Sequence, residues 1–174
     1  MNKSCIHIWI TLIVILLIAS VGFNLYFIIK SHQTTKNILN LATTYEKELS
    51  GDMIGLTESL DKAKENNWKT AQELLSIVQT MQLAETKAYF LLNINFLLSK
   101  NMQETLAPLD LFTVVLNEDL FAFNEAIANL NKGLPIDTKR LEDIRTKAEN
   151  AKFPLQDKFS IRELRFAIER YLGK

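Results

Sequence analysis

The sequence predicts an all-α protein in which an apolar N-terminal helix precedes a helical domain. Residues 6–29 contain no charged side chain, and beyond them apolar residues recur every three or four positions. No stretch sustains the alternation of apolar and polar residues that a strand would show. With 5 glycines and 3 prolines in 174 residues, the chain has few of the residues that form the turns of β folds.

The apolar segment 6–29 is predicted to be a transmembrane anchor behind a short tail, residues 1–5. As a helix rising ~1.5 Å per residue, it is long enough to cross the roughly 30 Å hydrocarbon core of a bilayer. A cleavable signal peptide is the alternative, with Ser20 and Gly22 as the small residues of a cleavage site. The apolar run resumes at Phe23 and exceeds the usual length of a signal, which favours an uncleaved anchor.

Basic residues on either side of this segment bear on its orientation. Lys3 and the α-amine precede it, and Lys30 and Lys36 follow it, so the positive-inside counts nearly balance. The short N-terminal tail favours a cytoplasmic N-terminus. We therefore expect a single-pass protein whose helical domain lies outside the cytoplasm. Cys5 is the sole cysteine, so the chain cannot form an internal disulfide.

Residues 30–66 are predicted to form a stalk helix. The apolar positions are spaced alternately by three and four, close to a heptad, as in a coiled coil that joins two copies of the chain. This stripe consists of Ile38, Leu41, Ala42, Tyr45, Leu49, Met53, Leu56, Leu60 and Ala63.

Residues 67–174 are predicted to fold as antiparallel helical hairpins with short connections, as in helical-repeat proteins. The first helix begins near Asn67, with Thr70 and Glu73 as a capping box, and its dense apolar end at residues 89–98 is expected at the centre of the core. A second capping box, Asn101 with Glu104, precedes a helix that either kinks at Pro108 or begins there.

Polar and turn residues divide the remaining pattern. Residues 117–119, Asn-Glu-Asp, predict a break, and Gly133 with Pro135 stops the helix that follows. Asp137 is expected to cap a helix that ends at residues 153–154, Phe-Pro. Ser160 with Glu163 is expected to cap the last helix.

Composition excludes several classes of function. Lys plus Arg and Asp plus Glu each total 20, so the chain lacks the basic excess of a nucleic-acid-binding surface. No histidine follows His32, which removes the central residue of Ser–His, Cys–His and His–metal sites, and no glycine-rich phosphate loop is present. The acid pairs at 118–119 and 142–143 are typical of helix caps or a solvated face. We therefore assign no catalytic residue, metal or cofactor and favour a non-enzymatic protein.

Two further sets of residues match a site by type alone. Met81, Met102, Tyr89 and His32 could ligate a haem or flank a porphyrin, but apolar residues at helical spacing are more often core. Basic residues recur at 139–152 and on the last helix, and interleaved acids there predict a solvated face rather than an anion site. These basic residues are Lys139, Arg140, Arg145, Lys147, Lys152, Arg162, Arg165 and Arg170.

Residues 83–156 resemble the central part of HemX-type membrane proteins. The resemblance rests on the order and spacing of the segments 83–92, 105–110, 121–127, 134–137 and 153–155, behind an N-terminal anchor and a coiled-coil helix. Their sequences are LAETKAYFLL, TLAPLD, FAFNEAI, LPID and FPL. The resemblance does not extend to the long N-terminal tail and the large C-terminal half of that family.

The resemblance implies a bacterial inner-membrane protein with a periplasmic helical domain, encoded with enzymes of haem synthesis. The expected function is that of a membrane-anchored scaffold that binds protein partners. Haem-biosynthesis enzymes are the expected partners, and self-association through the stalk is expected as well. Two alternatives remain open. One is a tetrapyrrole-binding or uroporphyrinogen-III C-methyltransferase-type protein, as the family label implies, and the other is an extracytoplasmic sensor-like bundle.

Overall fold

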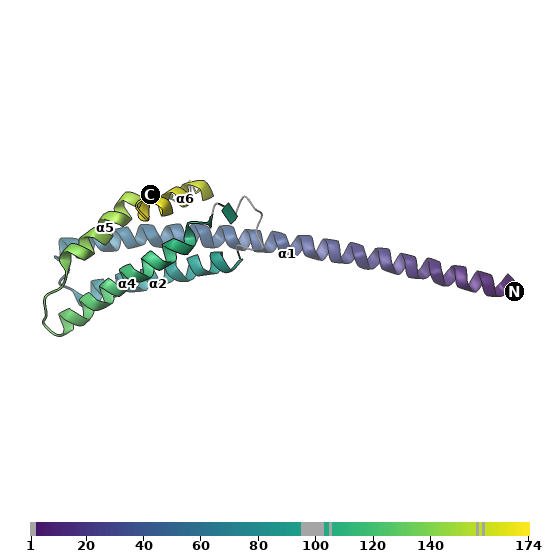
Figure 1. Ribbon diagram of the computed structural model, residues 1–174, viewed down its shortest axis with the longest axis horizontal. Coiled ribbons are helices and arrows are strands. Elements are labelled where there is room, and N and C mark those ends of the chain that lie inside the picture. The colour runs from purple at the N-terminus through teal and green to yellow at the C-terminus, as the bar shows by residue number, and fades with distance from the viewer. Residues whose placement is uncertain (1–2, 95–102, 105, 156, 158) are drawn as a thin grey trace. The chain divides into compact units, whose positions relative to one another are not determined.

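The computed structural model describes residues 3–94, 103–104, 106–155, 157 and 159–174, with side chains described from residue 20 onward. Every element in these ranges is helical, so the predicted all-α class is confirmed for the described residues. The helices are α1 (Lys3–Glu65), α2 (Ala71–Ile94), α4 (Leu109–Asn131), α5 (Thr138–Ala151) and α6 (Ile161–Tyr171) (Figure 1). The chain forms two compact units, Met1–Asn40 and Leu41–Lys174.

The first unit consists of the N-terminal part of α1. The apolar side chains of residues 21–29 are exposed on every side of the helix, with Phe23 and Ile28 about two-thirds accessible. Residues 6–19 of the predicted anchor have side chains outside the described set. Across the part of the chain that is described, none of the helices carries a stretch sufficiently long and apolar to span a bilayer.

The second unit is built on the C-terminal part of α1, from Leu41 to Glu65. Most of the predicted apolar stripe lies on the face that it buries, since Ala42, Leu49, Met53, Leu56, Leu60 and Ala63 are all inaccessible to solvent, whereas Leu41 is 44 % exposed. The near-heptad spacing thus serves packing inside the domain, and residues 41–65 of the predicted stalk belong to this unit.

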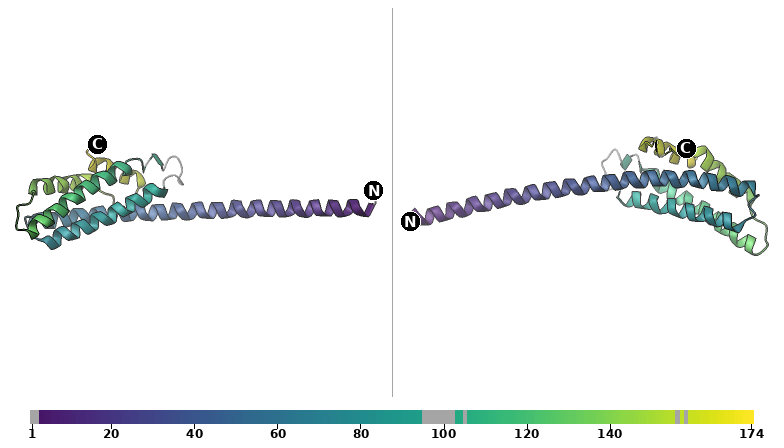
Figure 2. Two further views of the ribbon diagram at one scale, coloured as in Figure 1. Left: turned by 60° about the horizontal axis from the view of Figure 1, so that its bottom comes forward. Right: turned by 180° about the vertical axis from the view of Figure 1, so that it is seen from behind.

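The helices α1 and α2 run in opposite directions, as the hairpin prediction requires. Along α1 and α2, Tyr45 stacks on Phe90 with ring centroids 4.1 Å apart, while Asp52 accepts from Lys87 nearer the connecting turn. α4 lies beside α2, and α5 lies beside α6 (Figure 2). α6 departs from the hairpin pattern, because its last turn returns to the end of α5, where the Arg170 guanidinium donates to the Ala151 carbonyl at 2.8 Å.

α4 is continuous through residues 117–119, so the predicted break there is wrong. The polar residues bind neighbouring helices instead of ending their own. The Asn117 amide donates to Glu85 of α2, and the Asp119 carboxylate is buried against α5 and α6. Polar side chains favour helix ends when they compete for local backbone groups, and these two have tertiary partners.

Most of the helix ends lie close to the positions predicted from the sequence. α4 begins directly after Pro108, so the later start is confirmed, and Asn101 of the predicted capping box lies outside the described residues. Gly133 adopts φ +66° just beyond the end of α4. The Asp137 carboxylate caps α5 by accepting from the Arg140 amide at 3.0 Å. Ser160 occupies the N-cap position of α6 without a side-chain cap bond.

Among residues 89–94 of the predicted core centre 89–98, only Leu91 is fully buried. Ala88 and Leu91 are buried, but Tyr89 is about half exposed, and residues 95–98 lie outside the described set. Aromatic rings instead gather between α4, α6 and the loop after α5. There the centroid of the Phe112 ring lies 5.4 Å from the centroid of the Tyr171 ring and 6.4 Å from that of the Phe153 ring.

Replacing Leu56 by Ala should lower the free energy of unfolding by about 2–5 kcal/mol, because it leaves a cavity under the buried face of α1. Urea titration followed by helical circular dichroism measures this change. Leu83→Ala on α2 removes the same atoms from a half-exposed site and should cost less than about 0.5 kcal/mol. Equal losses for the two variants would contradict the proposed core.

Candidate functional site: the polar clusters of the helical domain

A buried polar cluster joins α4, α5 and α6. Asp119 of α4 is 5 % exposed and accepts from the Lys147 ammonium at 3.0 and 3.2 Å and from the Tyr171 hydroxyl at 2.9 Å. Both carboxylate oxygens are therefore satisfied, as a buried charge requires. Burial, followed by the charge of Asp119, raises the pKa of Tyr171 well above its usual value. The phenol keeps its proton and serves as a donor rather than as a base.

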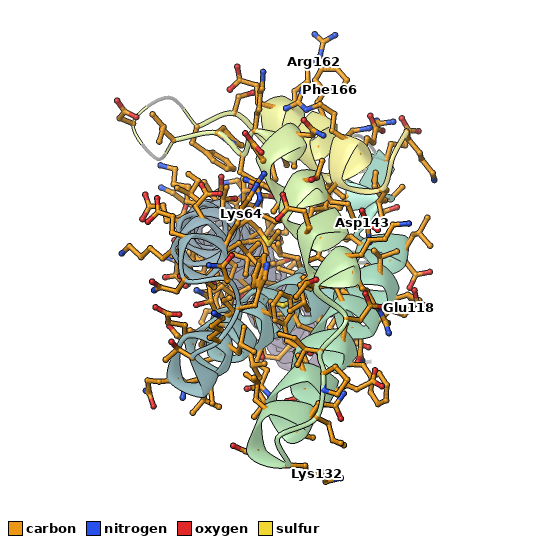
Figure 3. All side chains as sticks on the ribbon, turned by 90° about the vertical axis from the view of Figure 1, so that its left-hand side faces the viewer. Lys64, Glu118, Lys132, Asp143, Arg162 and Phe166 are labelled. Carbon is orange, nitrogen blue, oxygen red and sulfur yellow. The ribbon has the colours of Figure 1, made fainter. Side chains whose placement is uncertain are left out.

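An open groove lies over this cluster. It has a volume of about 470 Å³, and acidic side chains stand on both walls, Glu118 from α4 and Asp143 from α5. Figure 3 shows these two residues on the same side of the domain. Lys147 and Tyr171 also line the groove but are engaged with Asp119, so the groove presents no nucleophile with an adjacent base.

A second cluster fastens α5 to α1. The Arg145 guanidinium lies 2.7 Å from Asp61, 3.0 Å from Glu142 and 3.1 Å from Glu149. The hydrogen bond to Asp61 contributes most to raising the pKa of Arg145. Lys64 also donates to Glu142, at 2.7 Å, and this bond is the largest cause of the lowered pKa of that carboxyl.

Glu46 is a buried carboxyl of a different kind. It lies on the buried face of α1 with 2 % exposure, one turn before Ser50, and Oε1 has no hydrogen-bond partner among the described residues. Burial raises its pKa to about 7. The Ser50 hydroxyl, by contrast, donates to the Pro154 carbonyl at 2.6 Å. Glu46 thus has a buried carboxyl oxygen without such a partner, as does the half-buried Glu73 at Oε2.

Two of the residues considered for haem, Met81 and Tyr89, do not share a site. Met81 is fully buried in the core, whereas Tyr89 on the same helix points to solvent. His32 belongs to the first unit, and Met102 lies outside the described residues. Within the described residues, no group of three or more His, Cys, Asp or Glu side chains is placed to hold a metal ion.

Several acidic and basic residues were expected on a solvated face, and the structure corrects that expectation. Asp119 of the pair 118–119 is buried, and Arg145 and Lys147 bind carboxylates on other helices. The sequence holds a partial signal for these contacts. Asp119 falls three residues after Leu116 and three before Ala122, in register with the buried stripe of α4. A charged residue in register with core positions predicts a buried partner on another helix.

Comparison with family models, with curated proteins and with solved structures gives no match to this chain. The assignment of function therefore depends on the residues and contacts described above.

Replacing Lys147 by Met should lower the free energy of unfolding by about 1–3 kcal/mol, because the Asp119 carboxylate would stay buried with one donor fewer. The matched control is Lys139→Met on the same helix, an exposed position at which we expect a change within about 0.5 kcal/mol. Chemical denaturation at pH 7 compares the two. If Lys147→Met were as stable as the control, the cluster would not join the three helices.

The raised pKa of Glu46 predicts that the domain loses stability as pH rises from 4.5 to about 7. In this pH window the Glu46 carboxyl has lost its proton in the unfolded chain but retains it in the folded domain. The free energy of unfolding therefore falls as pH rises, by roughly 3 kcal/mol in total. Glu46→Gln should remove this part of the pH dependence, measured as unfolding free energy from pH 4.5 to 8. Glu58→Gln, exposed on the same helix, should leave the slope unchanged.

Proposed function

We propose that the chain is a single-pass, membrane-anchored helical scaffold whose domain binds a protein partner. The observation that carries this proposal is a stripe of exposed apolar side chains on α4, formed by Leu111, Val114 and Phe121. Phe121 is 63 % exposed, the largest fraction among the described apolar side chains of the second unit. Clustered exposed apolar residues, above all aromatic ones, mark protein interfaces.

The chemistry of the polar clusters supports a binding role over a catalytic one. The buried carboxylate Asp119 and the guanidinium of Arg145 each join helices to one another. Tyr171 is held in its protonated form, and Lys147 is bound to Asp119. Groups engaged in this way fix the positions of the helices that present the α4 stripe.

Two further parts of the proposal rest on sequence. The apolar segment 6–29 supports attachment to a membrane, and the exposed apolar side chains at residues 21–29 are those that a bilayer would cover. The resemblance to HemX-type proteins supports a bacterial inner membrane, a domain on its outer face and a partner among haem-synthesis enzymes.

A charge placed within the apolar segment should detach the protein from the membrane. Leu17→Arg would place a guanidinium near the bilayer centre at a cost of about 2.5–3.5 kcal/mol, so the fraction resistant to alkaline carbonate extraction should fall. Thr35→Arg, beyond the segment, should leave extraction unchanged. Complete extraction of the unaltered protein by carbonate would contradict the anchor.

A photo-crosslinking residue at position 121 should capture a defined partner from native membranes, whereas the same residue at Leu83 should not. Both side chains are more than half exposed, but Leu83 lies on α2, outside the α4 stripe. Mass spectrometry identifies the captured protein, and Phe121→Ser should abolish its co-purification. Capture of a haem-synthesis enzyme would support the pathway. Capture of a secretion protein would refute the assignment to haem synthesis. Identical products at positions 121 and 83 would refute the interface on α4.

A further inference from the structure

The exposed side of α6 carries an aromatic residue between two arginines. Arg162, Phe166 and Arg170 follow one another at four-residue steps and therefore share one face of the helix. The Arg162 guanidinium lies 5.5 Å from the centre of the Phe166 ring. Figure 3 shows both side chains at the edge of the domain, pointing away from it.

These two arginines differ from the other three in the chain. Arg140, Arg145 and Arg165 each lie within 4 Å of a carboxylate, at 3.7, 2.7 and 2.8 Å respectively. Arg162 and Arg170 have no carboxylate partner among the described residues. Arg170 donates instead to the backbone carbonyls of Ala151 and Lys152, so its charge is not neutralised.

A hollow of about 330 Å³ lies beside this stripe. It is lined by Lys152, Pro154, Leu155, Glu163, Phe166 and Arg170. Leu155 is 56 % exposed, so the hollow combines open apolar surface with cationic groups and one acid. The sequence from 152 to 174 contains six basic and three acidic residues, although the whole chain is neutral. The volume is at the small end of the range for ligand sites and suits a headgroup rather than a folded segment.

We propose that this surface, the α6 face (Lys152, Leu155, Arg162, Phe166 and Arg170), rests on anionic phospholipid headgroups. Exposed aromatic and aliphatic side chains surrounded by cations are the composition of surfaces that lie in the membrane interface. The negative potential of anionic lipids attracts such cations within a Debye length.

The α6 face proposal rests on the proposed anchor, which would hold the domain close to the lipid. Residues 30–40 of α1, about 17 Å of helix, connect the apolar segment to the domain. Such a tether gives a high effective concentration at the membrane surface, so a weak contact suffices.

The test uses the full chain with Cys5→Ser and Leu155→Cys, labelled at position 155 with an environment-sensitive dye. The protein is reconstituted in nanodiscs of phosphatidylcholine alone or with one-third phosphatidylglycerol. Quenching by neutral acrylamide should fall about threefold in the anionic discs, and about 1 M salt should restore it. The same label at position 121, on α4, should be quenched equally in both discs.

Matched charge variants separate attraction by charge from non-specific shielding. Lys152→Gln with Arg162→Gln should abolish the difference between the discs, whereas Lys69→Gln with Lys132→Gln, exposed elsewhere, should preserve it. Equal quenching at position 155 in both discs, with the chain inserted, would overturn the α6 face alone. Failure of the chain to elute with neutral discs would overturn the anchor and the inference together.

Discussion

The burial of one face of α1 is the constraint on which the rest of the domain depends. Side chains from Ala42 to Ala63 on this face are inaccessible to solvent. Contacts on its flanks attach the other elements, with Asp52 binding Lys87 of α2 and Asp61 binding Arg145 of α5. Since a partly buried ion pair adds little stability by itself, apolar burial supplies the stability and the charges fix which helix lies where.

The positions of α4, α5 and α6 depend on a second, polar constraint. Asp119 can be buried in the middle of α4 because Lys147 and Tyr171 arrive from two other helices to bind it. The two hydrogen bonds from Lys147 and the one from Tyr171 all join residues distant in sequence. The cluster therefore forms only when α4, α5 and α6 are all in place. On the outer side of α4, Leu111, Val114 and Phe121 are exposed to solvent.

Local chemistry was sufficient to predict much of the fold from sequence. The stripe from Ala42 to Ala63, the cap at Asp137 and the stop at Gly133 follow from spacing and backbone preference, and the structure confirms them. The break at 117–119 was wrong because partners distant in sequence satisfy Asn117 and Asp119. Spacing also could not distinguish a stripe that faces a second copy from one that packs within the domain.

The candidate site was less predictable than the fold. Arg162, Phe166 and Arg170 follow one another at four-residue steps in the sequence, but interleaved acids predicted a solvated face rather than an anion site. The structure pairs Glu169 with Arg165 and leaves the two flanking arginines without a carboxylate among the described residues. Which acid neutralises which base is decided by side-chain geometry, and composition alone cannot supply it.

Hydrogen exchange on the full-length chain, read by mass spectrometry peptide by peptide, tests the central role of α1 most directly. If the buried face of α1 organises the domain, amides of residues 42–63 should open with the same free energy as those in the middle of α2 and α4, as one cooperative unit. Exchange of residues 42–63 at a markedly lower opening free energy, with α2 and α4 still protected, would contradict that role.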